Sequence, residues 1–248
     1  MIICKSASEI ETMREAGRIA AAALEAVGEA VCPGIATGHL DRIAEEVIRS
    51  SGAVPAFKGY HGFPATICAS PNNTVVHGIP GAGVLVEGDI LSVDVGAILD
   101  GYYGDCAATF TVGRVEPEAF ALVEATRLAL EAGIERCHPG MRLYDISAAV
   151  QAVAEAAGFS VVREYVGHGI GQSMHEEPQI PNHGRAGTGP VLAEGMVFAI
   201  EPMVNAGGAG VRALDDGWSV VTEDGSLSAH FEHTVAVTAK GPIVLTAA

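Results

Sequence analysis

The stretch VLVEGDILSVD at residues 84–94 has a counterpart, VLAEGMVFAIE, at residues 191–201. The two stretches share four identities at an offset of 107, and the second ends on Glu201 where the first ends on Asp94. Each combines a run rich in Val, Ile and Leu, typical of a buried strand, with an acidic residue at its end. Such internal similarity indicates a duplicated unit. We therefore expect two like halves, each with a strand that carries a carboxylate.

The helical segments of the chain support the duplication. Residues 23–54 match residues 129–160 at nine of 32 positions, at an offset of 106. Apolar residues recur there at spacings of three and four, and Pro-Gly or Gly follows each run. Ser8 and Glu11 predict a capping box at the start of the first helix. Helices are predicted near residues 8–31, 40–50, 117–138 and 145–158.

Short runs rich in Val, Ile and Thr predict strands after each helix pair. They cover residues 65–69, 74–77, 90–97, 106–112, 160–164, 197–202, 218–222 and 231–238. The order helix, helix, strands thus occurs twice, which predicts an α+β fold with a pseudo-twofold axis and a central antiparallel sheet flanked by helices. We expect one domain over residues 1–248, with pseudo-repeat halves at roughly 1–115 and 116–248.

Composition and charge exclude several classes of protein. Apolar residues make up 49% of the 248 residues, which indicates a globular chain rather than a disordered one. The net charge of -16 opposes binding to nucleic acid or to an anionic membrane. Five cysteines without a C-x-x-C pair favour a reducing compartment, and the N-terminal sequence lacks the pattern of a signal peptide. We expect a cytoplasmic protein without membrane or nucleic-acid partners.

Four acidic residues lie within apolar strand-like runs, where a packed sheet normally avoids charge. Asp94 and Asp105 are separated by a predicted turn, so an antiparallel hairpin can place both carboxylates on one face. Glu201 and Glu232 lie in later runs, and His168 lies among glycines in the sequence GHGIGQSMH. Taken singly, each acidic residue is also consistent with a turn or an edge strand, and His168 is also consistent with an imidazole packed in the core.

Taken together, these residues predict a dinuclear metal centre. Four buried carboxylates and one neutral imidazole carry a charge of -4, which two divalent ions balance. One imidazole with oxygen ligands favours Mn, Fe, Co or Zn over Ca. Two such ions can activate a shared water molecule for hydrolysis.

Other catalytic signatures are incomplete in this sequence. GHGIG lacks the spacing of a dinucleotide-binding loop, GQSMH lacks the last glycine of a nucleophile elbow, and HEEPQ lacks the second histidine of a zinc-protease helix. Cys68 and Cys106 have no nearby base in the sequence and are expected to pack as small apolar groups.

Six segments together resemble the type I methionine aminopeptidases of family M24, in the family's order and over nearly the whole chain. They are GYHGFPATICAS, VVHGIP, SVDVGAILDGYYGDCAATF, GHGIGQSMHEEPQIPN, EGMVFAIEP and SAHFEHTVAVT. The resemblance implies the pseudo-symmetric pita-bread fold. It also implies a metalloprotease that removes the N-terminal methionine from nascent proteins and peptides when the second residue is small.

The resemblance further assigns the ligands of two divalent metal ions. These are Asp94, Asp105, His168, Glu201 and Glu232, with Asp105 and Glu232 bridging both ions. Glu201 would also accept and shuttle a proton.

The resemblance implies roles for two further histidines and a substrate pocket. His175 would stabilise the oxyanion, and His77 would contact the substrate nitrogen or the tetrahedral species. Phe57 and Tyr165 would lie near the pocket. The side chains expected to bind the substrate are Tyr60, Phe63, Cys68, His77, Met174, His175 and Trp218.

Three more positions, Asn72, Thr74 and Ser228, match a family site for a monovalent cation, Na or K. The resemblance also implies a monomer that associates transiently with the ribosome. Met174 stands where relatives often carry an aromatic residue, and Phe57 where some carry cysteine.

Two alternatives are a non-catalytic binding module of the same fold and another dinuclear aminopeptidase, such as an Xaa-Pro peptidase. The full set of ligand candidates argues against the binding module. A length of 248 residues leaves no room for the additional N-terminal domain usual in prolidase-type enzymes.

Overall fold

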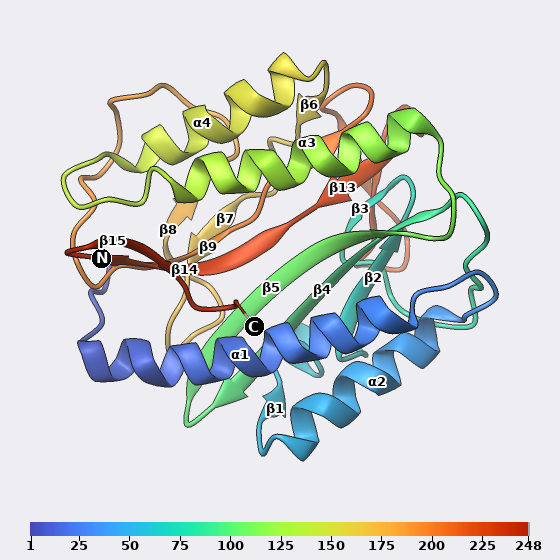
Figure 1. Ribbon diagram of the computed structural model, residues 1–248, viewed down its shortest axis with the longest axis horizontal. Helices are drawn as coiled ribbons and strands as arrows, with labels where there is room; N and C mark the ends of the chain where they lie inside the picture. The colour runs from blue at the N-terminus through green and yellow to red at the C-terminus, as the bar shows by residue number, and fades with distance from the viewer. Residues whose placement is uncertain (248) are drawn as a thin grey trace.

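Four helices form two pairs in the computed structural model, which describes residues 1–247. Figure 1 shows one pair along one half of a central sheet and the second pair along the other half. The helices are α1 (Ala7–Ala30), α2 (Thr37–Ser50), α3 (Pro117–Ile134) and α4 (Leu143–Ala156).

Helix α1 begins earlier than its predicted capping box. Ser6 is the N-cap: its Oγ accepts from the backbone N–H of Glu9 at 3.4 Å, and its own N–H donates to Glu9 Oε2 at 2.7 Å. The predicted pairing of Ser8 with Glu11 is therefore wrong. The segment carries two overlapping S-x-x-E patterns, and the first of them forms the cap.

The central sheet has nine strands, all paired antiparallel, in the order β1-β4-β5-β14-β9-β7-β8, with β2 on β4 and β15 on β14. This arrangement confirms the predicted antiparallel sheet flanked by helices. Its strands are β1 (Val54–Pro55), β2 (Ile67–Pro71), β4 (Ile90–Leu99), β5 (Tyr102–Thr111), β7 (Gly167–Gly169), β8 (Glu176–Ile180), β9 (Val197–Ile200), β14 (Glu232–Thr238) and β15 (Gly241–Val244).

Two three-stranded sheets, β13-β10-β6 and β11-β12-β3, complete the fold, and a short 3-10 helix covers Tyr60–Gly62. Their strands are β3 (Thr74–Val76), β6 (Ser160–Val161), β10 (Met203–Asn205), β11 (Val211–Ala213), β12 (Val220–Thr222) and β13 (Ser228–His230). Most strands that the sequence pattern missed have only two to five residues, too few to display a period of two.

Equivalent backbone contacts occur in the two halves of the chain. Leu85 N–H donates to the carbonyl of Ile35 at 2.9 Å, and Leu192 N–H donates to the carbonyl of Met141 at 2.7 Å. Leu85 and Leu192 are the matched leucines of the repeated stretch. Each bond ties the segment that leads into a buried strand to the loop before the second helix of its half.

The helices cover one face of the strands and leave the acidic residues on the other. Val93 and Val95 of β4 pack in one buried cluster with side chains of α1 and α2. Ile200 of β9 packs in a second cluster with side chains of α3 and α4. Because successive strand residues point to opposite faces, Asp94 and Glu201 point away from the helices.

Helix α1 lies against backbone on two sides. A Cβ atom at Gly104 of β5 would lie 2.4 Å from the backbone nitrogen of Gly17, and a Cβ at Gly17 would lie 2.5 Å from the carbonyl oxygen of Leu245. Contacts this short leave no space for a side chain at either position. The first helix is thus held between a central strand and the last residues that the structure describes.

Over residues 1–247, no helix is both long enough and apolar enough to cross a membrane. All five cysteines are free thiols.

Candidate metal centre

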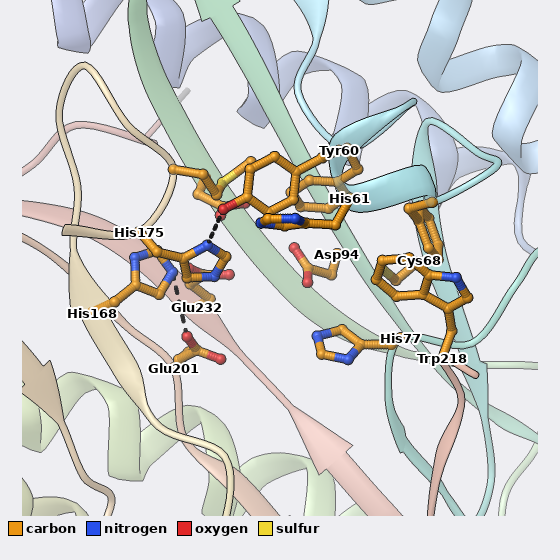
Figure 2. A pocket seen from close by; sticks show the side chains of 14 residues that line it. Tyr60, His61, Cys68, His77, Asp94, His168, His175, Glu201, Trp218 and Glu232 are labelled. Carbon is orange, nitrogen blue, oxygen red and sulfur yellow. Dashed lines mark hydrogen bonds and ion pairs between the residues drawn. The ribbon is translucent and has the colours of Figure 1, made fainter. Parts of the chain in front are cut away.

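The five predicted ligands come from five neighbouring strands and line one cavity of about 450 Å³. Asp94 lies on β4, Asp105 on β5, His168 on β7, Glu232 at the start of β14, and Glu201 directly after β9. These strands follow one another across the sheet, so residues distant in sequence meet on its helix-free face. Figure 2 shows Asp94 between the Glu201, Glu232 and His168 group and the aromatic end of the pocket.

A tight hairpin aligns the first two carboxylates. Asp100 and Gly101 form its turn with φ of 49° and 81°, a left-handed pair typical of a two-residue hairpin loop. The resulting register sets Asp105 opposite Gly96, two residues after Asp94. Residues two apart share a face, so both carboxylates point into the cavity.

The carboxylates are buried without enough internal partners. Asp94 Oδ1, Asp105 Oδ1 and Glu232 Oε1 are inaccessible to solvent and have no hydrogen-bond partner among residues 1–247. Ligand atoms of Asp105, His168 and Glu232 all lie within 4.8 Å of one another. A buried carboxylate without partners is costly, and divalent cations would offset that cost. The donor set, oxygens with one imidazole, fits such ions.

Burial dominates the protonation of this cluster. It raises the pKa of Asp94 to about 7. Burial, together with the charges of neighbouring carboxylates, raises the pKa values of Asp105, Glu201 and Glu232 well above the usual range. In the absence of cations, the four groups therefore resist carrying four charges at once.

His168 presents an unprotonated nitrogen to the cavity. Its Nδ1–H donates to the carbonyl of Gly169 at 2.9 Å, which leaves Nε2 as the acceptor, 3.6 Å from Glu201 Oε1. Burial lowers the pKa of His168 to about 4, so the ring is neutral near pH 7. A Cβ at Gly169 would lie 2.2 Å from the carbonyl oxygen of Glu177, so this position requires glycine.

Two more imidazoles border the acidic cluster. His175 Nδ1 lies 2.8 Å from the hydroxyl oxygen of Tyr60, and its ring centroid lies 4.3 Å from that of His168 (Figure 2). Burial lowers the pKa of His77 to about 4. The backbone of His77 has φ of 60°, a strained conformation that occurs preferentially at functional sites.

The other end of the cavity is apolar. The rings of Phe63 and Trp218 meet edge to face, with centroids 5.0 Å apart, and Phe57 also lines this end. All the predicted substrate-binding residues line the cavity: Tyr60, Phe63, Cys68, His77, Met174, His175 and Trp218. Tyr165 contacts the edge of His77, at 5.7 Å between ring centroids.

The buried thiols of Cys68 and Cys106 are poor nucleophiles. Burial first, and then the neighbouring carboxylates, raise the pKa of each thiol well above its usual value. Both groups are therefore protonated thiols near pH 7, as the sequence analysis expected of packed cysteines.

Sequence reasoning missed two histidines at this site. His61 lines the cavity beside Tyr60. His230 is buried, and its Nε2 lies 3.7 Å from Glu201 Oε2. His61 could have been found from its place next to the predicted Tyr60, whereas His230 reaches the site only through the pairing of distant segments.

Two of the three residues expected at a monovalent-cation site are neighbours in space. Ser228 N–H donates to the carbonyl oxygen of Asn72 at 2.9 Å. Thr74 begins β3, two residues after Asn72.

Comparison with known proteins gives concordant matches. A sequence model of metallopeptidase family M24 matches residues 11–239. The methionine aminopeptidase of Clostridium perfringens is 54% identical over 99% of both chains. The crystal structure of the Thermotoga maritima methionine aminopeptidase superposes with a TM-score of 0.99, at 47% identity over the full length of both chains. The prolidase of Pyrococcus furiosus matches with a TM-score of 0.81 at 24% identity, covering 99% of this chain and 66% of that one, a likeness of fold alone.

Proposed function

The chain belongs to metallopeptidase family M24, and we propose that it removes the N-terminal methionine from peptides and nascent proteins whose second residue is small. The observation that carries this proposal is the cavity itself. One end holds four acids, of which Asp105 and Glu232 are buried, and a neutral imidazole, and the other end is an apolar chamber lined by Trp218 and Phe63. A methionine side chain is apolar, flexible and polarisable, and it favours contact with aromatic rings.

Asp94, Asp105, His168, Glu201 and Glu232 would hold two divalent ions, drawn from Mn, Fe, Co or Zn. When bound, such ions lower the pKa of a water molecule and polarise the carbonyl of the scissile peptide bond. The orphaned oxygens of Asp94, Asp105 and Glu232 support this assignment.

Glu201 is the proton carrier in the proposed reaction. Its carboxylate lies beside the other acids and faces the cavity. It accepts a proton from the attacking water and returns it to the nitrogen of the leaving peptide.

His175 stabilises the oxyanion that forms on the methionine carbonyl. If the Tyr60 hydroxyl donates to Nδ1, the neutral ring carries its hydrogen on Nε2, as an oxyanion donor requires. His77 lies at the boundary of the polar and apolar ends and hydrogen-bonds to the substrate backbone. Its lowered pKa keeps it neutral near pH 7.

The finer parts of the proposal concern the setting of the reaction. We place it in the cytoplasm, where nascent chains emerge, and the five free thiols suit a reducing compartment. The enzyme acts as a monomer with transient ribosome contact. Asn72, Thr74 and Ser228 bind a monovalent cation, and the contact between Asn72 and Ser228 supports this.

The alternatives are less well supported. A likeness to prolidases at 24% identity carries the fold and not the substrate. A binding module would not need four acids gathered around one imidazole, since acids removed from solvent cost folding free energy.

Peptide cleavage tests the proposal directly. The protein is stripped of metal, reloaded separately with Mn, Co, Fe or Zn, and incubated with Met-Ala-Ser, Met-Leu-Ser and Ala-Pro-Ser. We expect metal-dependent release of methionine from Met-Ala-Ser only, measured by mass spectrometry. Cleavage before proline would instead support an Xaa-Pro peptidase, and no release with any metal would support a binding module.

A further inference from the structure

His230, at the end of β13, is a buried imidazole aimed at the proposed proton carrier. Its side chain is 2% exposed, and Nε2 lies 3.7 Å from Glu201 Oε2. This distance is longer than a hydrogen bond, and Nε2 has no hydrogen-bond partner among the described residues. An unpartnered buried nitrogen is rare in folded proteins and calls for a functional explanation.

Glu201 lies between two imidazoles, one on each carboxyl oxygen. His168 Nε2 is 3.6 Å from Oε1, and His230 Nε2 is 3.7 Å from Oε2. His168 presents a lone pair, because its Nδ1–H is used by the carbonyl of Gly169. A second lone pair facing Oε2 would be repulsive, so His230 Nε2 carries the hydrogen. The two oxygens of Glu201 therefore have different surroundings.

The backbone of His230 is held firmly by β5. Its N–H donates to Thr109 Oγ1 at 2.9 Å, and the Thr109 hydroxyl donates back to the carbonyl of His230 at 2.8 Å. Because this uses the hydrogen of Thr109, the 2.8 Å contact with Ser92 must be a hydrogen bond that Ser92 donates. All these groups are buried. The imidazole is thus attached to a fixed support, against which a neighbouring carboxylate can be oriented.

We propose that His230 is a positioning residue whose Nε2–H donates a hydrogen bond to Glu201 Oε2 in the working enzyme. The bond requires a movement of less than about 1 Å from the present separation. It holds Oε2 away from the centre and presents Oε1 to the side where Asp105, His168 and Glu232 converge. Hydrogen bonds of this kind to metal-ligating carboxylates typically change metal affinity or activity about 10- to 100-fold. The inference rests on the proposed role of Glu201.

Two substitutions that introduce the same amide group on side chains of different length test this inference. In His230→Gln the amide nitrogen reaches as far as Nε2 of histidine, whereas in His230→Asn it does not. Calorimetric titration of the metal-stripped proteins with Mn²⁺ measures affinity, and methionine release from Met-Ala-Ser measures kcat and KM. We expect His230→Asn to lose about 10-fold or more in Mn²⁺ affinity and in kcat, with little change in KM, and His230→Gln to stay within about threefold of the parent protein. Equal behaviour of the two variants, or parent-like Mn²⁺ affinity in His230→Asn, would overturn the inference.

His233→Asn is the matched control. His233 is a half-buried imidazole three residues later, and it points to the opposite face of the sheet from Glu232, where its Nδ1 hydrogen-bonds to Thr246 Oγ1 at 2.9 Å. Its loss should lower the melting temperature without changing Mn²⁺ affinity.

Thr109→Val is the alternative variant if His230→Asn does not fold. It keeps the imidazole of His230 and removes the hydroxyl that holds its backbone, so an unchanged Mn²⁺ affinity in this variant would also contradict the inference. The Mn²⁺ affinities test the role of His230 independently of peptide cleavage. If the parent protein binds Mn²⁺ but releases no methionine, that result contradicts the proposed function and leaves the test of His230 intact.

Discussion

Asp105 lies in the middle of β5, buried, with one carboxyl oxygen that has no hydrogen-bond partner within residues 1–247. Its pKa is raised by burial first and by the neighbouring acids second. Between the unfolded and folded pKa values the folded protein binds the extra proton, so this group destabilises the metal-free fold increasingly as pH rises. The same carboxylate is a candidate metal ligand, and its two effects can be separated by substitution.

Asp105→Asn should therefore raise the stability of the metal-free protein while it abolishes metal binding. At pH 8 we expect the melting temperature of the stripped variant to exceed that of the stripped parent by about 2–8 °C, with the difference shrinking toward pH 4. Asp41→Asn is the contrasting control, because the Asp41 carboxylate accepts hydrogen bonds from the N–H groups of Thr66 and Ile67 at 2.8 and 3.0 Å. This substitution should lower the melting temperature. Parent-like Mn²⁺ affinity in Asp105→Asn would show that the metal centre is misassigned.

Tyr60→Phe should separate the orientation of His175 from substrate binding. The change removes only the hydroxyl that lies 2.8 Å from Nδ1, so the imidazole loses the partner that sets its tautomer. A lost hydrogen bond of about 1 kcal/mol predicts a fall in kcat of about fivefold, with KM nearly unchanged, in steady-state methionine release. Tyr165→Phe serves as the control, because it removes a hydroxyl from a ring that lies beside His77 and not beside His175. A rise in KM alone would assign Tyr60 to the pocket wall only.

At the scale of single residues, the sequence predicted which acids meet because an acid within an apolar strand is anomalous. Asp94, Asp105, Glu201 and Glu232 stand out in this way, and the structure brings all four into one cavity. His230 could not be recognised, because a histidine in a short strand is unremarkable. Its relation to Glu201 arises only when β13 pairs with β10 and lies against β5.

At the scale of elements, Lys5 joins the segment before α1 to the first residue of β8, Glu176. Its Nζ lies 2.7 Å from Glu176 Oε2, and the two side chains are 4% and 10% exposed. Glu176 follows Met174 and His175, which both line the cavity. The ion pair therefore helps to fix the loop that carries these two residues.

Breaking this ion pair from one side should cost more than removing it altogether. Lys5→Met and Glu176→Gln each leave a buried group without its partner, and we expect each to lower the free energy of unfolding by about 3–5 kcal/mol in urea denaturation. The double variant should lose less than the sum of the two. Lys58→Met is the control, since Lys58 is 41% exposed in its pair with Glu45 and should change stability by less than about 1 kcal/mol. Additive losses in the double variant would mean that the two side chains do not interact.

The helices were predictable as elements because their period is sustained over 14 to 24 residues. Their ends were less so: α3 ends at Ile134, although the apolar pattern continues to the Pro-Gly signal at residues 139–140. The short strands β7, β10 and β13 carry or support functional side chains, yet three residues cannot display a pattern. Their pairing is decided by tertiary contacts.

At the scale of the whole molecule, the acids couple metal binding to folding. Metal removal by a chelator should lower the melting temperature, and restoring an ion at 100 times its dissociation constant should add about 2.7 kcal/mol of stability. Differential scanning calorimetry of stripped and reloaded protein measures the shift in melting temperature. Adding the ion to the stripped Asp105→Asn variant should cause no such shift. An equal melting temperature with and without ions would contradict a metal centre built from buried carboxylates.

The duplication was visible in the sequence because both halves use the same loop to start a buried strand. The matched bonds of Leu85 and Leu192 show why those positions stayed alike. The two halves differ where they supply ligands. One contributes a hairpin with two aspartates, and the other contributes one imidazole and two glutamates from separate strands. No internal comparison could have predicted that division.

The position of α1 between β5 and the segment around Leu245 bears on how the protein reaches its fold. A helix from the start of the chain cannot complete its packing until a segment made more than 200 residues later has arrived. Closing so long a loop carries a large entropic cost before any contact offsets it, which slows folding. During synthesis, the first helix pair would have to wait with part of its apolar surface uncovered. The packing of the first helix is therefore completed only after nearly the whole chain has been made.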